Sequence, residues 1–363
     1  MTDRALATYV RDLKPLLPPG IFKPARSRSW WLPVHLASLT LGWCALSGHW
    51  LPWLAAPLLS LVLGASFAGL TFLAHETLHG AVVRHARLRH VVGWLGFSHF
   101  FVSPRLWVAW HNRVHHGNTQ HPHADPDAYP TLVAYRQSRS LRIASRVAPG
   151  RSRILGVFSL LIGFSVQSAH MLFVAGRRGY LTPRQHAYAV LETLLGVGVW
   201  SALAVSIGAL PFLFGFVLPL LVANGIVMSF ILTNHLLSPL TTVNDPLANS
   251  LTVSTPRWLE WLTLGFGFHV EHHLFPAMSA RHAPAVRGLL QALWPNRYQS
   301  LPLLRATAAL HRSPRIYKTA TVLTDPETGA EWPTLAAKTA PTRAPRKRGS
   351  WRLLRGPRVH RTA

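Results

Sequence analysis

Apolar residues along this chain gather in runs of about 20, the length at which an α-helix crosses the roughly 30 Å hydrocarbon core of a bilayer. Four such runs stand out, at residues 30–47, 51–74, 188–207 and 210–233. Three residues separate the first pair, and only Gly208 and Ala209 separate the second pair. The helices of each pair must therefore be antiparallel. The pattern predicts an all-α integral membrane protein with four transmembrane helices arranged as two hairpins.

Three further apolar stretches, at 91–110, 154–175 and 258–268, fit a crossing helix less well. The first two have arginine at both ends, which conflicts with the tendency of basic residues to stay on the cytoplasmic side. The stretch 154–175 also contains Gln167, Ser168 and His170. We expect all three to be interfacial helices, and the remaining polar segments to form a cytoplasmic helical cap.

The distribution of basic residues gives an orientation. Neither hairpin turn contains Lys or Arg, whereas the segment before residue 30 and the segment after residue 83 are rich in them. Both termini and the long middle segment should then face the cytoplasm of a multi-pass protein, and a bacterial inner membrane is the expected location. The first run starts far from the N-terminus without a small-residue cleavage site, which favours a retained span.

These features divide the chain into three parts. Residues 1–29 form a cytoplasmic N-terminal segment, residues 30–304 the membrane domain, and residues 305–363 a basic C-terminal tail. The tail contains no acidic residue from 339 onward, and we expect it to be largely disordered.

Composition narrows the function classes. The formal charge is +25 over 363 residues, but no nucleic-acid-binding motif accompanies it, so membrane orientation and anionic lipid account for the excess. The single cysteine, Cys44, lies in the first apolar run and excludes disulfides and thiolate clusters. A metal would need histidine or carboxylate ligands.

Histidine is the informative residue. Three clusters occur at ligand spacing, and a ninth histidine follows Asn234 at the end of the fourth run: His75 and His79; His111, His115 and His116; His269, His272 and His273; and His235. Residues three or four apart share one face of a helix, so each cluster offers its imidazoles to one point. With 154–175 on the membrane surface, all nine lie at the same cytoplasmic boundary. If that stretch crossed alone, the third cluster would fall on the opposite side.

Nine imidazoles exceed the ligand number of one ion and point to two metals. Neutral nitrogen ligands with open positions favour redox-active iron over a closed structural zinc. A ligating imidazole usually donates its other N–H to a carboxylate, and the nearest carboxylates in sequence are Glu76, Asp125, Asp127 and Glu271. The isolated histidines His35, His49, His99 and His186 are interpreted as ordinary polar residues.

The three clusters resemble the H-x-x-x-H, H-x-x-x-H-H and H-x-x-H-H boxes of the membrane fatty acid desaturase family. Gly80 after the first box, and Gly117-Asn118-Thr119 with Asp125-Pro126-Asp127 after the second, extend the likeness. The third box lies in GFHVEHHLFP at 267–276, similar to bacterial acyl-lipid desaturases. Asn234-His235 resembles the pair that completes the di-iron shell. The resemblance covers residues from about 30 to 304.

The resemblance implies two Fe ions, O₂ as co-substrate and insertion of a double bond into a lipid-linked or thioester-linked acyl chain. Front-end desaturases have Gln where His269 stands and carry a fused cytochrome b5 domain, whose His-Pro-Gly-Gly motif is absent here. Electrons would then come from a separate ferredoxin or cytochrome b5-type donor, steered by the basic surface. Related lipid hydroxylases and carotenoid- or sphingolipid-modifying oxygenases use similar boxes and stay open as alternatives.

Two competing classes also use histidine. The first box is literally H-E-x-x-H, the signature of zinc proteases in which Glu76 would activate a zinc-bound water. That interpretation leaves the second and third boxes unexplained. A metal transporter would place its sites near the bilayer midplane on broken helices, whereas these histidines lie at helix ends.

Overall fold

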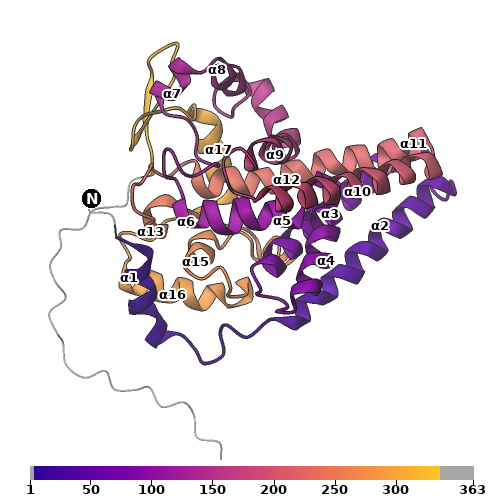
Figure 1. The fold of residues 1–363 in the computed structure, drawn as a ribbon, viewed down its shortest axis with the longest axis horizontal. Coiled ribbons are helices and arrows are strands. Elements are labelled where there is room, and N and C mark those ends of the chain that lie inside the picture. Colours follow the sequence, from indigo (N-terminus) through magenta and orange to yellow (C-terminus); the bar gives the residue numbers. More distant parts are fainter. Residues whose placement is uncertain (1–3, 336–363) are drawn as a thin grey trace, which may run out of the picture.

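The computed structural model describes residues 4–335. Its long helices form one bundle whose two hairpin turns lie at the same end (Figure 1). The bundle consists of α2 (Trp31–Ser47), α3 (Ala56–Leu78), α10 (Pro183–Ile207) and α12 (Leu218–His235), with α11 (Ala209–Phe212) and the π-helix η6 (Leu213–Val217) leading into α12. The two predicted hairpins and the all-α membrane class are confirmed.

Helix α3 lies in the middle of the bundle because glycines let its neighbours approach closely. A Cβ atom on Gly64 would lie 2.5 Å from Cβ of Val222 on α12, and one on Gly69 would lie 2.3 Å from Nε2 of His35 on α2. Only glycine leaves room for such contacts. The C-terminal end of α3, which carries the first histidine box, is therefore fixed by packing on both sides.

Four helices of the described chain are long and apolar enough to cross a membrane: Trp53–Leu78, Ile154–Ala175, Pro183–Ile207 and Ala209–His235. This set differs from our prediction in two places. Helix α2 has 17 residues and falls short of that length. Helix α9 (Arg153–Ala175), expected at the interface, has a mean hydropathy of 1.7 over its best window, close to the 1.8 of α10. Length and composition thus do not separate α9 from a crossing helix, because its few polar residues are outweighed by apolar ones.

The stretch 91–110 is not one interfacial helix, and that expectation was wrong. It is divided into α4 (Ala86–Phe97), η4 (Ser98–Phe100) and α5 (Pro104–Trp107). Phe101 adopts a left-handed φ of 59°, which ends the first part. Ser103 then caps α5 by accepting hydrogen bonds from the backbone N–H groups of the next turn.

The cap around the box-bearing end of the bundle is built from short elements (Figure 1). The helices are α1 (Leu6–Leu13), η1 (Lys14–Leu16), η2 (Arg26–Trp30), η5 (Val108–His115), α6 (His116–Asn118), α7 (Leu132–Gln137), α8 (Arg139–Arg146), α13 (Pro246–Asn249), α14 (Arg257–Leu262), α15 (His269–Leu274), η7 (Ala280–His282), α16 (Ala283–Leu293) and α17 (Leu303–Arg312). At the opposite end of the bundle, η3 (Trp53–Ala55) leads from the first hairpin turn into α3. Strands β1 (Thr252–Ser254) and β2 (Ser300–Pro302) pair in parallel, and β3 (Tyr317–Thr319), β4 (Val322–Thr324) and β5 (Glu331–Pro333) form an antiparallel sheet in that order. Tyr9 and Leu13 of α1 are fully buried in a core shared with α15 and α16, so the N-terminal segment belongs to the cap.

The chain does not become a disordered tail at residue 305. Leu310 of α17 and Leu323 of β4 are buried, and Arg315 between these elements is 1% exposed. The Arg315 guanidinium donates to backbone carbonyls, including Leu236 O at 2.7 Å. These hydrogen bonds offset the free-energy cost of burying the Arg315 charge. The expectation of disorder from residue 339 onward lies outside the described residues.

Candidate metal centre

The first histidine box lies at the end of α3. His75 is in the last turn of the helix and His79 is its C-cap residue. A separation of four residues places both side chains on the same face. Their ring centroids are 4.8 Å apart.

The second box lies on a π-helix. Residues Val108–His115 form η5, and the backbone N–H of His116 bonds to the carbonyl of His111, five residues earlier. In an α-helix, His116 would point to a different face from His111. The wider π turn brings it back beneath His111, so that all three histidines of the box face the site. Single π turns are frequent at functional sites.

The third box and His235 complete the arrangement from the other half of the chain. Helix α15 carries His269, His272 and His273, and His235 ends α12. Gly267 lets the chain before α15 approach β1, because a Cβ there would lie 2.4 Å from the Val253 carbonyl oxygen. Nine histidines from four helical segments therefore converge, as the sequence predicts.

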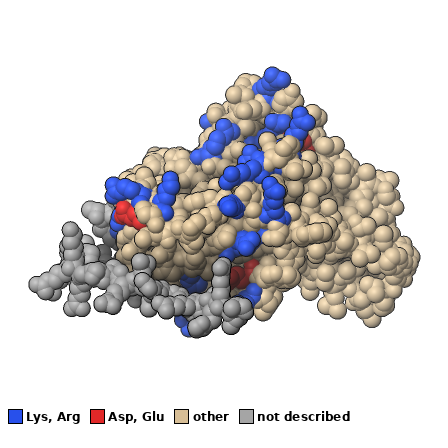
Figure 2. All heavy atoms as spheres, turned by 90° about the horizontal axis from the view of Figure 1, so that it is seen from below, with Lys and Arg blue, Asp and Glu red and all other residues tan. Residues whose placement is uncertain are grey.

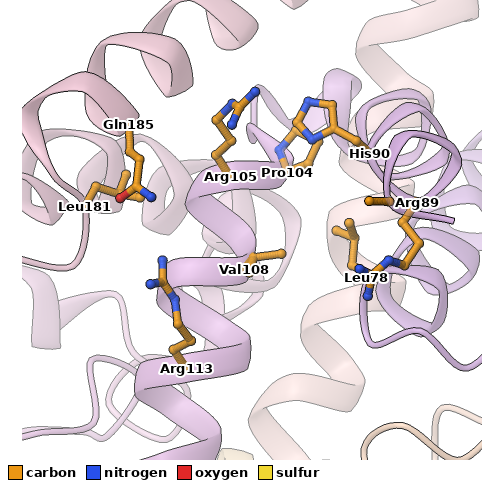
Figure 3. Close-up of a pocket in the computed structure, with 10 residues that line it drawn as sticks. Leu78, Arg89, His90, Pro104, Arg105, Val108, Arg113, Leu181 and Gln185 are labelled. Atoms are coloured by element: carbon orange, nitrogen blue, oxygen red, sulfur yellow. The ribbon is translucent and has the colours of Figure 1, made fainter. Parts of the chain in front are cut away.

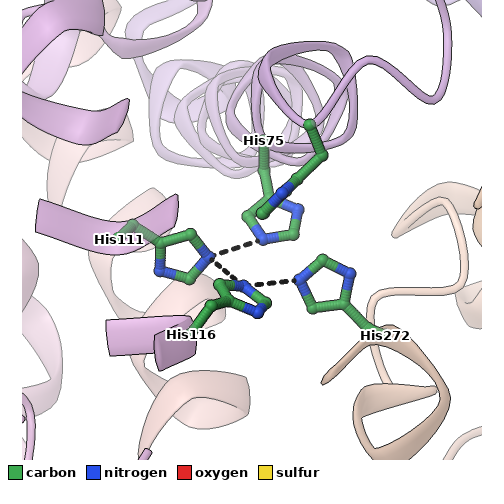
Figure 4. A group of neighbouring side chains, drawn as sticks. His75, His111, His116 and His272 are labelled. Atoms are coloured by element: carbon green, nitrogen blue, oxygen red, sulfur yellow. Dashed lines mark hydrogen bonds between the residues drawn. The ribbon is translucent and has the colours of Figure 1, made fainter. Parts of the chain in front are cut away.

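The nine divide into two groups. The first contains His75, His79, His111, His116 and His272, whose nearest ring nitrogens all lie within 4.8 Å of one another. Figure 4 shows four of these rings facing a common centre. The Nε2 atom of His111 is 3.1 Å from that of His75 and 3.2 Å from that of His116, and His272 Nε2 is 3.1 Å from His116 Nε2.

The second group contains His115, His235 and His273, with His269 beside them. His269 Nε2 lies 2.7 Å from His235 Nε2 and 3.1 Å from His273 Nε2. Three of these rings use their other nitrogen for a hydrogen bond. His115 Nδ1 is 3.0 Å from Asp125 Oδ1, His273 Nδ1 is 3.1 Å from Thr119 Oγ1, and His235 Nδ1 is 3.2 Å from the Asn249 carbonyl oxygen.

This donor set fits two metal ions better than a hydrogen-bonded core. A neutral imidazole carries one N–H and one lone pair, so the successive Nε2–Nε2 contacts cannot all be good hydrogen bonds. In the described chain, His79 Nε2 is buried without a hydrogen-bond partner. Imidazole nitrogens at right angles around a metal, each about 2.1 Å from it, would be about 3.0 Å apart, which is close to the observed separations. The bonds at Nδ1 leave Nε2 free to point at an ion.

Electrostatics keeps most of these rings neutral. Burial lowers the pKa of His79, His111 and His116 well below the usual 6.5 and that of His272 to about 3. Neutral imidazole is the form that binds metals. His115 differs: burial lowers its pKa, but the carboxylates of Asp125 and Asp127 outweigh this and raise the pKa to about 9.

Asp125 and Asp127 are where we expected them, beside an imidazole. Asp127 Oδ2 is 3.4 Å from His115 Nδ1. Its other oxygen accepts from Trp110 Nε1 at 2.8 Å and from Gln167 Nε2 at 2.7 Å. Gln167 belongs to α9, and nothing in the sequence spacing connects it to the second box.

Glu76 and Glu271, in contrast, do not orient an imidazole. Glu76 accepts from Arg28 Nη1 at 2.7 Å and from Ser279 Oγ at 2.6 Å. Glu271 accepts from Thr252 Oγ1 and Tyr298 OH, both at 2.6 Å. Because neighbours on a helix point in different directions, the glutamate of each box faces away from its histidines. Glu76 is therefore not aligned as the base that the zinc-protease interpretation needs.

Asn234, the remaining residue of the predicted site, is fully buried. Neither its amide nitrogen nor its amide oxygen has a hydrogen-bond partner in the described chain. Buried amide atoms without a partner are rare, so a bound water or ligand is expected at Asn234.

An apolar cavity of about 530 Å³ reaches the second group. It lies between α9 and α12 and is bounded by α8 and the loop after the second box, with side chains such as Phe158, Ile162 and Met228 on its walls. Its polar lining includes His235, Asp127 and Gln167. The volume is in the range of small-molecule and lipid sites.

The fold and the site define a helical membrane protein in which histidines from four segments meet beside an apolar cavity. A family model described as fatty acid desaturase matches residues 48–303. The chain therefore belongs to the fatty acid desaturase family, and it is an oxidoreductase. It is 21% identical over 304 residues to the sn-1 oleoyl-lipid 12-desaturase of Synechocystis sp., a match that covers 80% of this chain and 84% of that protein.

Proposed function

We propose that this protein is an oxygen-dependent desaturase that inserts a double bond into a lipid-linked or thioester-linked acyl chain. The observation that carries the proposal is the position of His235. Its Nε2 belongs to the second histidine group, and its ring also lines the apolar cavity between α9 and α12. An acyl chain in that cavity would lie directly beside the histidines.

The two histidine groups would hold one iron ion each. Bound iron would supply the O₂ activation that C–H oxidation requires. The chain's own residues would do the rest. The Asp125 and Asp127 carboxylates hold the Nδ1 proton of His115, Thr119 and Asn249 orient His273 and His235, and the apolar walls keep water away from the reacting methylenes.

We also propose a separate acidic electron donor of the ferredoxin or cytochrome b5 type. Figure 2 shows Lys and Arg gathered over the cap, while the hairpin end of the bundle carries none on this face. A positive surface raises the association rate of a negative partner, and the effect falls as ionic strength rises.

For the topology, we infer that α9 lies along the cytoplasmic membrane surface and that both termini and the site face the cytoplasm. The two ends of α9 support this. A Cβ on Gly156 would lie 3.7 Å from His311 of α17, and His186 Nε2 at the start of α10 lies 2.8 Å from the Leu172 carbonyl oxygen. Both neighbours are on the side of the bundle that carries the histidine boxes.

The topology is tested by cysteine labelling in a Cys44→Ser background. Arg146→Cys and Arg178→Cys place exposed thiols before and after α9, and Ser47→Cys places one near a hairpin turn. A membrane-impermeant maleimide added to intact spheroplasts should label only Ser47→Cys, and all three after lysis. External labelling at 146 or 178 alone would show that α9 crosses.

The activity is tested in a bacterial host without polyunsaturated lipids, supplied with a redox partner. Fatty acid methyl esters are profiled by mass spectrometry for the wild type, His272→Ala and the control His123→Ala, an exposed histidine outside both groups. A new double bond that is lost only in His272→Ala is the expected result. The metal content of the purified protein is measured in parallel. Two iron ions per protein with no new acyl product would redirect the search to other lipids, and one zinc ion with no iron would refute the proposal.

A further inference from the structure

A second cavity, of about 270 Å³, lies at the box-bearing end of the bundle and is unusually basic. Figure 3 shows its walls: α4, the α5–η5 segment and the start of α10. Arg89 and His90 come from α4, and Arg105 and Arg113 come from α5 and η5. We call it the arginine pocket. Apolar Leu78 and Val108 also line it.

The charge of the arginine pocket is not neutralised by the protein. Glu192 of α10 is the only carboxylate within ion-pair distance of the four basic residues in the described chain, and it binds Arg105 Nε at 2.7 Å and His90 Nε2 at 2.9 Å. Neither Arg89 nor Arg113 forms an ion pair within residues 4–335. Three guanidinium groups against one carboxylate leave a formal charge of +2 with His90 neutral.

The pocket is also held in shape before any ligand arrives. Ser103 Oγ donates to Glu192 Oε2 at 2.6 Å, and Trp94 Nε1 donates to the Glu192 carbonyl oxygen at 3.0 Å. Arg105 is fixed further, because its guanidinium carbon lies 5.1 Å from the Tyr188 ring centroid. The fixed guanidinium of Arg105 therefore loses less conformational freedom when it binds a ligand.

The chemistry of the lining selects a phosphate. Guanidinium groups match the geometry of phosphate oxygens and bind them through paired hydrogen bonds. Gln185 is in the first turn of the 25-residue helix α10, where the helix dipole favours an anion. This turn also begins a segment long enough to span the bilayer, so the pocket lies at the depth of lipid headgroups.

The pocket is next to the first histidine group along the chain. Leu78 lies between His75 and His79, and Arg113 lies between His111 and His115. Asn112 Nδ2 donates to the Leu78 carbonyl oxygen at 3.3 Å and joins the two boxes at this point. A ligand anchored here would therefore be held close to both boxes.

We propose that the arginine pocket binds the phosphate ester group of the molecule that delivers the acyl chain. The assignment rests on the proposed desaturase function and names the polar group that the substrate carries. A phospholipid and an acyl thioester of a phosphorylated carrier share this chemistry, and the test separates them.

The test uses the full-length protein in non-ionic detergent and measures binding by calorimetry. The probes are dihexanoyl phosphatidylglycerol, coenzyme A and the phosphate-free dihexanoylglycerol. The variants are Arg89→Gln and Arg113→Gln. The matched control is Arg87→Gln, which removes the same charge from an exposed position of the same helix without touching the pocket.

Loss of a charge-assisted contact should raise the Kd of a phosphate-bearing probe about tenfold or more in Arg89→Gln and Arg113→Gln. Arg87→Gln should change it less than about threefold, because only general attraction is lost. An effect on phosphatidylglycerol identifies a lipid-borne phosphate, and an effect on coenzyme A a thioester-borne one. Equal effects of all three variants, or no binding of either phosphate probe to the wild type, would overturn the assignment.

Binding is read without turnover, so the two proposals can fail separately. An inactive protein that still shows arginine-dependent binding would sink the desaturase function and leave the phosphate site standing. An active enzyme whose KM and kcat are the same in Arg113→Gln as in Arg87→Gln would sink the site and leave the function.

Discussion

Asp125→Asn tests whether the histidines form two separate metal sites. The Asp125 carboxylate makes three contacts: His115 Nδ1 at 3.0 Å, the Gln120 backbone N–H at 2.7 Å and the Asp127 backbone N–H at 3.0 Å. An asparagine can keep one oxygen in place, but its NH₂ group then faces the backbone donor of Gln120. The change also removes the charge that strengthens the bond to His115.

The size of the effect follows from these contacts. Losing the partner that orients a metal-binding imidazole typically costs about 10- to 100-fold in metal affinity, or about 1.4 to 2.8 kcal/mol. A lost charge-assisted hydrogen bond gives a similar figure of about 1.5 to 3 kcal/mol. His115 belongs with His235 and His273. The loss should therefore be confined to one metal, while the group around His75 keeps its own.

The assay is a chelator titration of purified protein with iron measured by mass spectrometry. Wild-type protein should lose both irons over one range of chelator concentration. Asp125→Asn should release one iron at a chelator concentration about 10- to 100-fold lower and retain the other. Glu271→Gln is the matched control, because Glu271 is buried beside the third box but touches Thr252 and Tyr298 instead of an imidazole. Glutamine has the size of Glu271, and the Tyr298 hydroxyl can turn to accept a hydrogen bond from its amide. Loss of both irons together in Asp125→Asn, or wild-type retention of both, would refute the two-group assignment.

Three further outcomes follow. His79→Ala should remove the other iron and spare the one near His115, and metal analysis showing the reverse order would contradict the grouping. Glu192→Ala leaves Arg105 and His90 without their carboxylate. Because Arg105 is partly exposed, we expect the free energy of unfolding to fall by about 1 kcal/mol, seen as a Tm lower by roughly 2–4 °C in detergent. Gly96→Ala would place a Cβ 2.4 Å from the Leu70 carbonyl oxygen and should lower the free energy of unfolding by about 1–3 kcal/mol. The control Gly198→Ala, whose Cβ would have no atom within 4 Å, should leave the Tm unchanged or raise it in the same thermal assay.

The hairpins and the histidine boxes could be predicted because both depend on local periodicity. A run of apolar residues fixes a helix length, and the spacing of His75 and His79 fixes a shared face. The π-helix under His111 and His116 could not be predicted, since no spacing rule reports one additional residue per turn. Thr119 and Asn249 were missed as partners of His273 and His235 because they approach from distant parts of the chain.

Composition misled where long-range packing decides the outcome. The basic character of the chain after residue 305 predicts a solvated tail, yet Arg315 is buried and bonded to backbone carbonyls, and Tyr317 donates to the Ser238 carbonyl oxygen at 2.8 Å. For α9, the apolar length is typical of a span, whereas the flanking arginines predict an interfacial helix. The contacts of its two ends with α17 and the start of α10 are long-range and could not be predicted from the sequence.

Glu76 shows most directly how one motif can serve different purposes. The H-E-x-x-H motif by itself would allow Glu76 to act as a catalytic base, and only the geometry of the folded chain excludes that role. The carboxylate joins Arg28 of the N-terminal segment to Ser279, which follows the third box, and it also accepts from the Ala280 backbone N–H at 2.9 Å. Three segments far apart in sequence are thereby fixed at the end of α3. Because α3 carries His75 and the loop before Ser279 follows His272, this contact sets the distance between two boxes whose imidazoles meet in the first group. Its role is to position the boxes, and the residues that bind the metal are the histidines on the neighbouring face.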